Sequence, residues 1–348
     1  MQYSKLYWKD IENVSRKIPN LKKLFHQSLL ITGGSGMICS SIVDLLFFLN
    51  QVQGADIKII LCGRNKEHMI NRFDGFYINK DYEFIYFDAT QLSDLDCNPD
   101  YIIHGASNAH PSAYSHEPVE TMMANILGLN TLLRLASTKE TKRLLYISSS
   151  EVYGKKGSNQ PYEENDYGFV DLLNPRACYP ISKRAAETLC VSYGQEYNVS
   201  SVIARPGHIY GPTITDTDSR ASAQFSRSAA KGEDIIMKSA GTQLRSYTYA
   251  LDCASAILTI LLNGENQQAY NISNPASICS IREMAEALAK AGNVRIIFEN
   301  PSDYEKKSYN LMDNSSLNSK KLIHLGWKAA FNLELGTQRT IEILKKNQ

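Results

Sequence analysis

The segment from residue 29 to residue 49 constrains the fold more strongly than any other part of the chain. It reads LLITGGSGMICSSIVDLLFFL, the pattern of a short apolar strand, a glycine turn and a buried helix. Glycines let a backbone touch a pyrophosphate, and the unpaired amide groups at the start of a helix attract the same anion. We therefore expect a nucleotide to bind here. The residues expected to contact it are Gly33, Ser35, Gly36, Met37 and Ile38.

The third small position of this motif holds Cys39, where Gly or Ala is usual. Cys is compact, so we expect the helix to pack closely on the strand despite this departure. A glycine turn alone is more often an ordinary loop than a cofactor site. A second motif at a fitting distance is needed to support a site.

That second motif combines Ser149, in YISSSEVYG, with Tyr179 and Lys183, in RACYPISKRAAETL. Tyr179 and Lys183 are four residues apart, so a helix beginning near Pro180 would place them on one face. A phenol that works near pH 7 needs its pKa lowered by about three units, or roughly 4 kcal/mol, and an ammonium about 4 Å away supplies that much. Ser149 would orient a substrate hydroxyl for proton removal while a hydride leaves its carbon.

Apolar strands alternate with amphipathic helices in the first two thirds of the chain. This alternation predicts an α/β fold with a doubly wound parallel sheet, whose ligands bind beyond the carboxyl ends of the strands. The motifs above lie at those ends. The expected strands are residues 29–32, 57–63, 82–88, 101–107, 143–150 and 200–206.

Taken together, these motifs resemble those of the extended short-chain dehydrogenases/reductases, in the NAD-dependent nucleotide-sugar epimerase, dehydratase and decarboxylase family. The likeness runs from about residue 28 to 345 and is closest to UDP-glucuronate decarboxylases, which share the Arg-Ala-Cys-Tyr and Ser-Glu-Val-Tyr-Gly motifs. Further segments that carry it are 87–90, 102–114, 125–133, 204–212 and 241–258.

The resemblance implies a domain organisation and an oligomeric state. Residues 28–208, joined by 246–273, would form a Rossmann-type dinucleotide-binding domain. A smaller, interleaved substrate-binding domain would take 209–245 and 274–348, and 1–27 would be an N-terminal extension. Related enzymes pair two helices from each subunit, which implies a homodimer through residues 119–137 and 184–197.

The resemblance also assigns cofactor contacts. Besides Tyr179 and Lys183, they are Asp88, Ala89, Gly105, Ala106, Ser107 and Asn125. NAD is the cofactor of the family, but the loop CGRNKEH lacks the acid that usually holds the ribose hydroxyls. Arg64 in this loop could meet the 2'-phosphate of NADP, or it could be a solvated surface residue.

Substrate contacts and the reaction type follow from the same comparison. Glu151 joins Ser149, Tyr179 and Lys183 as a catalytic candidate. The 4,6-dehydratases of this family carry a motif that resembles Thr-Asp-Glu at the positions of Ser149, Ser150 and Glu151. Ser150 therefore stands where a dehydratase has its acid. A decarboxylase needs only the 4-keto group, which delocalises the carbanion formed as carbon dioxide leaves. The substrate-contact candidates are Tyr114, Ser150, His208, Arg220 and Arg245. His208 stands where the family usually has Asn, and the two arginines would hold a pyrophosphate.

Three alternatives stay open beside the decarboxylase. Two are enzymes of the same family, a 4,6-dehydratase and a 4-epimerase. The third is a cofactor-sensing regulatory protein without turnover. The intact set of Ser149, Tyr179 and Lys183 argues against it because a sensor has no need of a base, and a turnover assay would discriminate.

Composition excludes other classes. A net charge of +1 without a basic run argues against nucleic acid, and the longest apolar run, IVDLLFFL, is short and interrupted by Asp44. Residues 1–27 carry charges where a signal peptide would be apolar. The seven Cys and seven His are scattered, so we expect no metal and a cytoplasmic protein with free thiols.

Overall fold

The computed structural model describes residues 4–74, 81–109, 111–300 and 312–346. Outside these ranges lie residues 1–3 of the expected extension, His110 of the 102–114 motif, and residues 301–311 and 347–348 of the expected substrate-binding domain.

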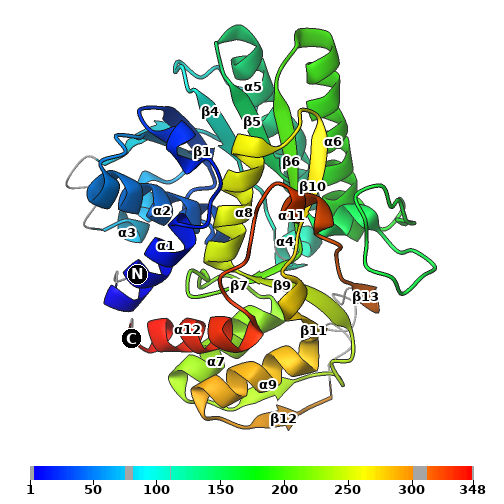
Figure 1. The fold of residues 1–348 in the computed structure, drawn as a ribbon. Helices are drawn as coiled ribbons and strands as arrows, with labels where there is room; N and C mark the ends of the chain where they lie inside the picture. The colour runs from blue at the N-terminus through cyan, green and yellow to red at the C-terminus, as the bar shows by residue number, and fades with distance from the viewer. Residues whose placement is uncertain (1–3, 75–80, 110, 301–311, 347–348) are drawn as a thin grey trace.

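A seven-stranded sheet forms the centre of the molecule, in the order β10-β6-β5-β4-β1-β2-β3 (Figure 1). Every pairing in it is parallel, which confirms the predicted doubly wound α/β fold. The strands are β1 Ser28–Thr32, β2 Lys58–Gly63, β3 Glu83–Tyr86, β4 Tyr101–His104, β5 Arg143–Ile147, β6 Ser201–Pro206 and β10 Gln268–Ile272.

Helices cover both faces of this sheet. Successive side chains of a strand point to opposite faces, and β1 shows this directly. Leu29 and Ile31 belong to a core cluster with α2 and α8, whereas Leu30 packs in a second cluster with α5 and α6. The bounds of these helices are Met37–Gln53 for α2, Pro118–Thr138 for α5, Cys178–Tyr197 for α6 and Ala250–Asn263 for α8. Between β2 and β3, α3 (Lys66–Arg72) adds Met69 to the first cluster.

A smaller group of elements lies below the sheet in Figure 1. Its four-stranded sheet contains β7 His208–Tyr210, β9 Leu244–Tyr249, β11 Ile278–Ser280 and β13 Asn314–Ser315, and a two-stranded sheet pairs β8 Ile235–Met237 with β12 Ile296–Phe298. The surrounding helices are α7 Ala221–Lys231, α9 Ile281–Gly292 and α12 Leu333–Lys346; α11 Lys320–His324 lies against β10. Since β9 runs directly into α8, the chain passes between the two groups of elements, and the division into two domains remains an interpretation.

The N-terminal extension is built into the core. Its helix α1 (Lys5–Ser15) packs on α2 and α8, and Tyr7 is fully buried. The Tyr7 hydroxyl donates to Asp44 Oδ2 at 2.7 Å, and Arg72 lies 2.6 Å from the same oxygen. These contacts explain why an apolar helix tolerates Asp44. From α12, Arg339 reaches Asp10 of α1 at 3.2 Å. The extension therefore packs on two helices that cover the sheet and is linked to α12 near the other end of the described chain.

Within the described ranges, no helix has the length and apolarity needed to span a membrane. The same residues contain no group of three or more His, Cys, Asp or Glu side chains that could hold a metal ion.

Candidate active site

The glycine turn lies at the carboxyl end of β1, against the end of β4. Gly33 has a φ of 72°, and a Cβ on it would lie 2.8 Å from the Ala106 nitrogen. The turn closes through a hydrogen bond from the Gly36 N–H to the Gly33 carbonyl at 2.9 Å, and α2 begins at the next residue. Backbone without side chains therefore faces the position where a pyrophosphate would approach. This cradle fits a dinucleotide.

Gly105 explains why Cys39 is tolerated in this motif. A Cβ on Gly105 would lie 2.4 Å from the Cys39 sulfur, so the missing side chain directly after β4 makes room for the sulfur on α2. Burial raises the pKa of the Cys39 thiol to about 12. Cys39 is thus a neutral packing residue, as the sequence interpretation supposed.

A buried hydrogen-bond network fixes the end of β4, and the sequence interpretation missed it. Thr32 Oγ1 accepts the N–H groups of Gly105 and Ala106, at 3.2 and 3.1 Å, and lies 2.7 Å from His104 Nδ1. Burial, and then the charge of Lys183, lower the His104 pKa to about 3, so this imidazole is neutral. Beyond it, Ser107 Oγ is buried with no partner among the described residues and is available to a cofactor.

Arg64 and Asp88 follow the neighbouring strands β2 and β3. Arg64 is exposed, whereas Asp88 is half-buried and accepts the Thr90 N–H at 2.9 Å. That backbone bond chiefly lowers the Asp88 pKa, and the charge of Arg64 contributes. Ala89 packs against α5, where a Cβ on Gly128 would lie 2.8 Å from its own. Arg64 and Asp88 thus stand at the same end of the sheet, and their contacts with the cofactor stay predictions.

If Arg64 meets a 2'-phosphate, Arg64→Ala should weaken NADP binding far more than NAD binding, by about 1.5 to 3 kcal/mol for a lost charged hydrogen bond. Calorimetric titration with each cofactor measures the difference. Lys66→Ala, which removes the same charge two residues away, is the control. Equal losses for both cofactors would make Arg64 a surface residue.

Asn125 hydrogen-bonds a residue of α6 in the structure. Its side chain is fully buried, and its amide donates to the Thr121 carbonyl at 3.0 Å and to Ser182 Oγ at 2.9 Å. Ser182 in turn donates to the carbonyls of Cys178 and Tyr179, at 2.6 and 3.1 Å. Asn125 therefore supports the first turn of α6 beneath Tyr179, and its expected direct contact with the cofactor stays a prediction.

Tyr179 lies on that first turn and is 5% exposed. Burial, and then the charge of Glu151, raise its pKa to about 12, although hydrogen bonds with Ser149 and Tyr114 act in the lowering direction. The expectation that the Tyr179 pKa is lowered by about three units is therefore wrong when only the protein's own groups act on it. Ser149, which follows β5, hydrogen-bonds the Tyr179 phenol, and its expected contact with a substrate hydroxyl stays a prediction.

The position of Lys183 explains why the Tyr179 pKa is not lowered. Its Nζ donates to the Ile147 carbonyl at 2.8 Å and lies 4.7 Å from the Tyr146 ring centroid, against 5.7 Å from the Tyr179 ring centroid. Burial lowers the Lys183 pKa to about 7. Desolvation thus weakens the charge that was expected to act on the phenol.

Tyr114 and Glu151 flank Tyr179. The Tyr114 ring stacks on the Tyr179 ring, with centroids 4.5 Å apart and planes 20° apart. Glu151 pairs with Arg176 through two contacts of 3.0 Å, a partner that the sequence interpretation missed. Ser150 lies between Ser149 and Glu151 in the short helix η2 (Ser150–Tyr153) and is buried.

The two predicted substrate arginines have different surroundings. Arg220 is ion-paired with Asp218, at 2.6 Å between Nη2 and Oδ2, so its charge is partly neutralised. Arg245 is 3% exposed and donates only to main-chain carbonyls, Leu244 at 2.8 Å and Met312 at 2.9 Å; it has no carboxylate partner among the described residues. Burial lowers its pKa. A buried guanidinium in this state favours an incoming anion.

His208 lies beside both arginines. Burial, followed by the charges of Arg245 and Arg220, lowers its pKa to about 3, so it is neutral. Its ring is 5.6 Å from that of Tyr247, and its buried Nδ1 has no partner within the described part of the chain. His208 could therefore offer a hydrogen bond to a substrate, as the Asn it replaces would.

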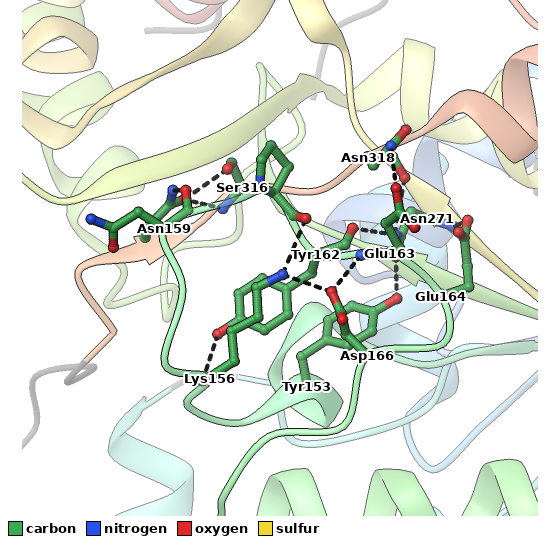
Figure 2. Close-up of polar contacts among 12 residues, drawn as sticks. Tyr153, Lys156, Asn159, Tyr162, Glu163, Glu164, Asp166, Asn271, Ser316 and Asn318 are labelled. Carbon is green, nitrogen blue, oxygen red and sulfur yellow. Dashed lines mark hydrogen bonds and ion pairs between the residues drawn. The ribbon is translucent and has the colours of Figure 1, made fainter.

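A polar network anchors the active-site segment to the rest of the molecule (Figure 2). The Tyr153 hydroxyl donates to Asn271 Oδ1 at 2.5 Å, and the Asn271 amide donates to the carbonyls of Tyr162 and Asn318, each at 3.0 Å. Lys156 pairs with Asp166 at 2.7 Å. These contacts join η2 and the loop after it to β10 and to the C-terminal segment, which fixes the position of Ser149 and Glu151.

A doubly wound parallel sheet with Ser, Tyr and Lys at its ligand edge defines an enzyme of the short-chain dehydrogenase/reductase type. Comparison with known families agrees: the model of the NAD dependent epimerase/dehydratase family matches residues 29–273. The chain belongs to this family, and its cofactor is accordingly NAD.

Individual relatives show which enzymes of the family the chain is similar to. UDP-glucuronic acid decarboxylase 1 of Xenopus tropicalis is 29% identical over 351 residues, covering 97% of this chain and 78% of that protein. UDP-glucuronic acid decarboxylase 3 of Arabidopsis thaliana is 31% identical over 314 residues, covering 88% and 86%. The UDP-glucuronic acid 4-epimerase of Bacillus cereus, solved with UDP-glucuronic acid and NAD, shares the fold at a TM-score of 0.75 and 19% identity, covering 92% of this chain and all of that one.

Proposed function

We propose that this protein is a nucleotide-sugar decarboxylase that acts on UDP-glucuronate through a 4-keto intermediate. The observation that carries the proposal is the group at the end of β5, where Ser149 and Glu151 flank Tyr179 and Ser150 stands in place of a dehydratase acid. The decarboxylases among its relatives, 29% and 31% identical over most of the chain, support it.

The chain's own residues divide the chemistry. Tyr179 takes the proton of the sugar 4-hydroxyl, which Ser149 orients. Bound NAD, held on the Gly33 turn and by Lys183, supplies a reversible hydride acceptor. Once C4 is a ketone, the bond between C5 and the carboxylate carbon breaks and carbon dioxide leaves. The electron pair of that bond stays on C5 and is delocalised into the 4-carbonyl. C5 then takes a proton, and reduction of the ketone restores the hydroxyl.

Arg245 is the best candidate to hold the pyrophosphate, because it is a buried cation and has no carboxylate partner among the described residues. Arg220 would bind more weakly because Asp218 already occupies its guanidinium. Tyr114 would line the sugar pocket.

The deciding experiment is product mass after incubation with UDP-glucuronate and NAD. Decarboxylation predicts a loss of about 44 Da without net NADH, whereas loss of about 18 Da from a hexose substrate would indicate a dehydratase. Unchanged mass with an inverted C4 would indicate an epimerase. If a panel of UDP-, dTDP-, CDP- and GDP-sugars stays untouched, the sensor hypothesis replaces the enzyme.

Replacing Lys183 by Met is expected to weaken cofactor binding and to shift the rising limb of the rate–pH profile to higher pH. A positive charge favours the phenolate, so its removal raises the pKa of the phenol and delays formation of the base. Because the Lys183 pKa is lowered to about 7, the charge acts mostly near neutrality and below. Profiles measured over about pH 6 to 9 test this, and an unchanged profile would refute the role.

We also propose a homodimer built on α5 and α6. The two helices lie side by side, and Val119, Val191 and Tyr197 on them are 63%, 43% and 53% exposed. Light scattering at micromolar concentration should give twice the mass of the chain, and a strictly monomeric mass would count against the dimer. A cytoplasmic location is proposed in addition, since all seven cysteines are free thiols.

A further inference from the structure

Arg176 and Glu151 form a two-armed ion pair beside Tyr179. Arg176 Nη1 lies 3.0 Å from Glu151 Oε2, and Nη2 lies 3.0 Å from Oε1. The side chains are 29% and 21% exposed. Two parallel N–H donors, one on each oxygen of the carboxylate, fix the orientation of the Glu151 side chain.

Glu151 is connected to the catalytic pair through its backbone and its charge. Its N–H donates to Ser149 Oγ at 3.2 Å, and Ser149 hydrogen-bonds Tyr179. Its carboxylate acts in the direction that raises the Tyr179 pKa, so it lies within electrostatic reach of the phenol. A displaced Glu151 would therefore disturb both groups.

Arg176 is itself held in place. It lies on the short helix η3 (Pro175–Ala177), where its N–H donates to Asn174 Oδ1 at 3.0 Å. Its guanidinium carbon is 5.8 Å from the centroid of Tyr114, the ring that stacks on Tyr179. One side chain thus contacts both neighbours of the catalytic phenol.

We propose that Arg176 is a positioning residue that holds Glu151 as a fixed anionic acceptor, so that Glu151 orients a sugar hydroxyl and transfers no proton. A carboxylate bound by an arginine fork keeps lone pairs for a substrate hydroxyl. What this chain lacks for the expulsion of a hydroxyl group is the acid, because Ser150 stands in the acid position and a carboxylate anion has no proton to donate. The inference rests on the proposed function.

Arg176→Ala is expected to lower kcat for UDP-glucuronate by about 10- to 100-fold, the effect of a lost charged hydrogen bond, and to change KM by less than about threefold. Arg176→Lys should retain more activity than Arg176→Ala. Added guanidinium ion should restore part of the rate of Arg176→Ala, because the site is partly open to solvent. Sodium chloride at the same ionic strength should not.

The decisive comparison is a double-mutant cycle. If Arg176 acts through Glu151, Arg176→Ala should cost less than about threefold in a Glu151→Gln background, and guanidinium should have no effect there. Arg184→Ala is the matched control. Arg184 lies on α6 and donates to main-chain carbonyls, Val152 at 2.6 Å and Gly168 at 2.9 Å, so any effect of its loss should be independent of Glu151→Gln.

The outcomes separate the two proposals. If the wild-type protein converts UDP-glucuronate but the costs of Arg176→Ala and Glu151→Gln are additive, the positioning role is overturned and the function stands. If the wild-type protein neither binds nor converts UDP-glucuronate, the proposed function fails and the inference fails with it. A loss in KM alone, without guanidinium rescue, would make Arg176 a structural or binding residue.

Discussion

Replacing Tyr179 by Phe is expected to lower kcat by about 10²- to 10⁴-fold, the usual contribution of a general base, while the fold and NAD binding are retained. The substitution removes one hydroxyl from a ring that is 5% exposed and stacked on Tyr114, so packing is kept. The rate of product formation and the thermal unfolding midpoint, measured on the same preparation, test both parts of this expectation.

Tyr167→Phe provides the control. This tyrosine is 79% exposed on the loop before α6, so losing its hydroxyl should leave the rate unchanged. Full activity in Tyr179→Phe would remove Tyr179 from the mechanism. A rate loss accompanied by a large fall in the unfolding midpoint would indicate a damaged fold and no specific loss of the base.

Local patterns were sufficient to predict the parallel α/β sheet and its strands other than β10, which was not among the expected ones. Strands such as β1 and β6 are short runs buried on both faces, and the alternation with helices leaves few other arrangements. The N-terminal helix was not predicted as part of the core because residues 5–15 contain no pattern that indicates the helix against which they pack. Its place depends on Tyr7 meeting Asp44 in α2, 37 residues away.

The identities of the catalytic residues could be inferred from motifs, but their electrostatics could not. A spacing of four residues places Tyr179 and Lys183 on one helix, yet the direction of the lysine depends on the Ile147 carbonyl of β5. The resulting burial sets both pKa values. Such desolvation is a property of the assembled core and has no signal in the sequence.

The missed ion pair has a similar cause. Arg176 stands three residues before Tyr179 in a motif that sequence comparison had already selected, so a signal was present. Its partner Glu151, however, is 25 residues earlier, and only the return of the loop between them brings the two together. For Arg220, by contrast, the partner Asp218 is two residues away, within reach of a local search for opposite charges.

Gly105→Ala is expected to be the most destabilising of the conservative substitutions considered, at about 1 to 3 kcal/mol, because overpacking a closed site forces neighbours to move. The new Cβ would lie 2.4 Å from Cys39 Sγ, whereas the next contacts, Ile147 Cδ1 at 3.2 Å and the Thr32 carbonyl at 3.3 Å, are tight but need only a shift of a few tenths of an ångström. Removing the sulfur should therefore relieve most of the strain. We expect Gly105→Ala to cost at least about 1 kcal/mol less in a Cys39→Ala background than in the wild type.

Urea unfolding of the wild type, the two single variants and the double variant measures this coupling. Gly157→Ala is the matched control, since a Cβ on Gly157 would meet nothing within 4 Å, and we expect a change within about 0.5 kcal/mol. NAD affinity should follow the same order as stability, because Gly105 and Ala106 form the wall against which Gly33 turns. Additive costs would instead mean that Gly105 is required by the backbone of β4, and that the room beside Cys39 has another origin.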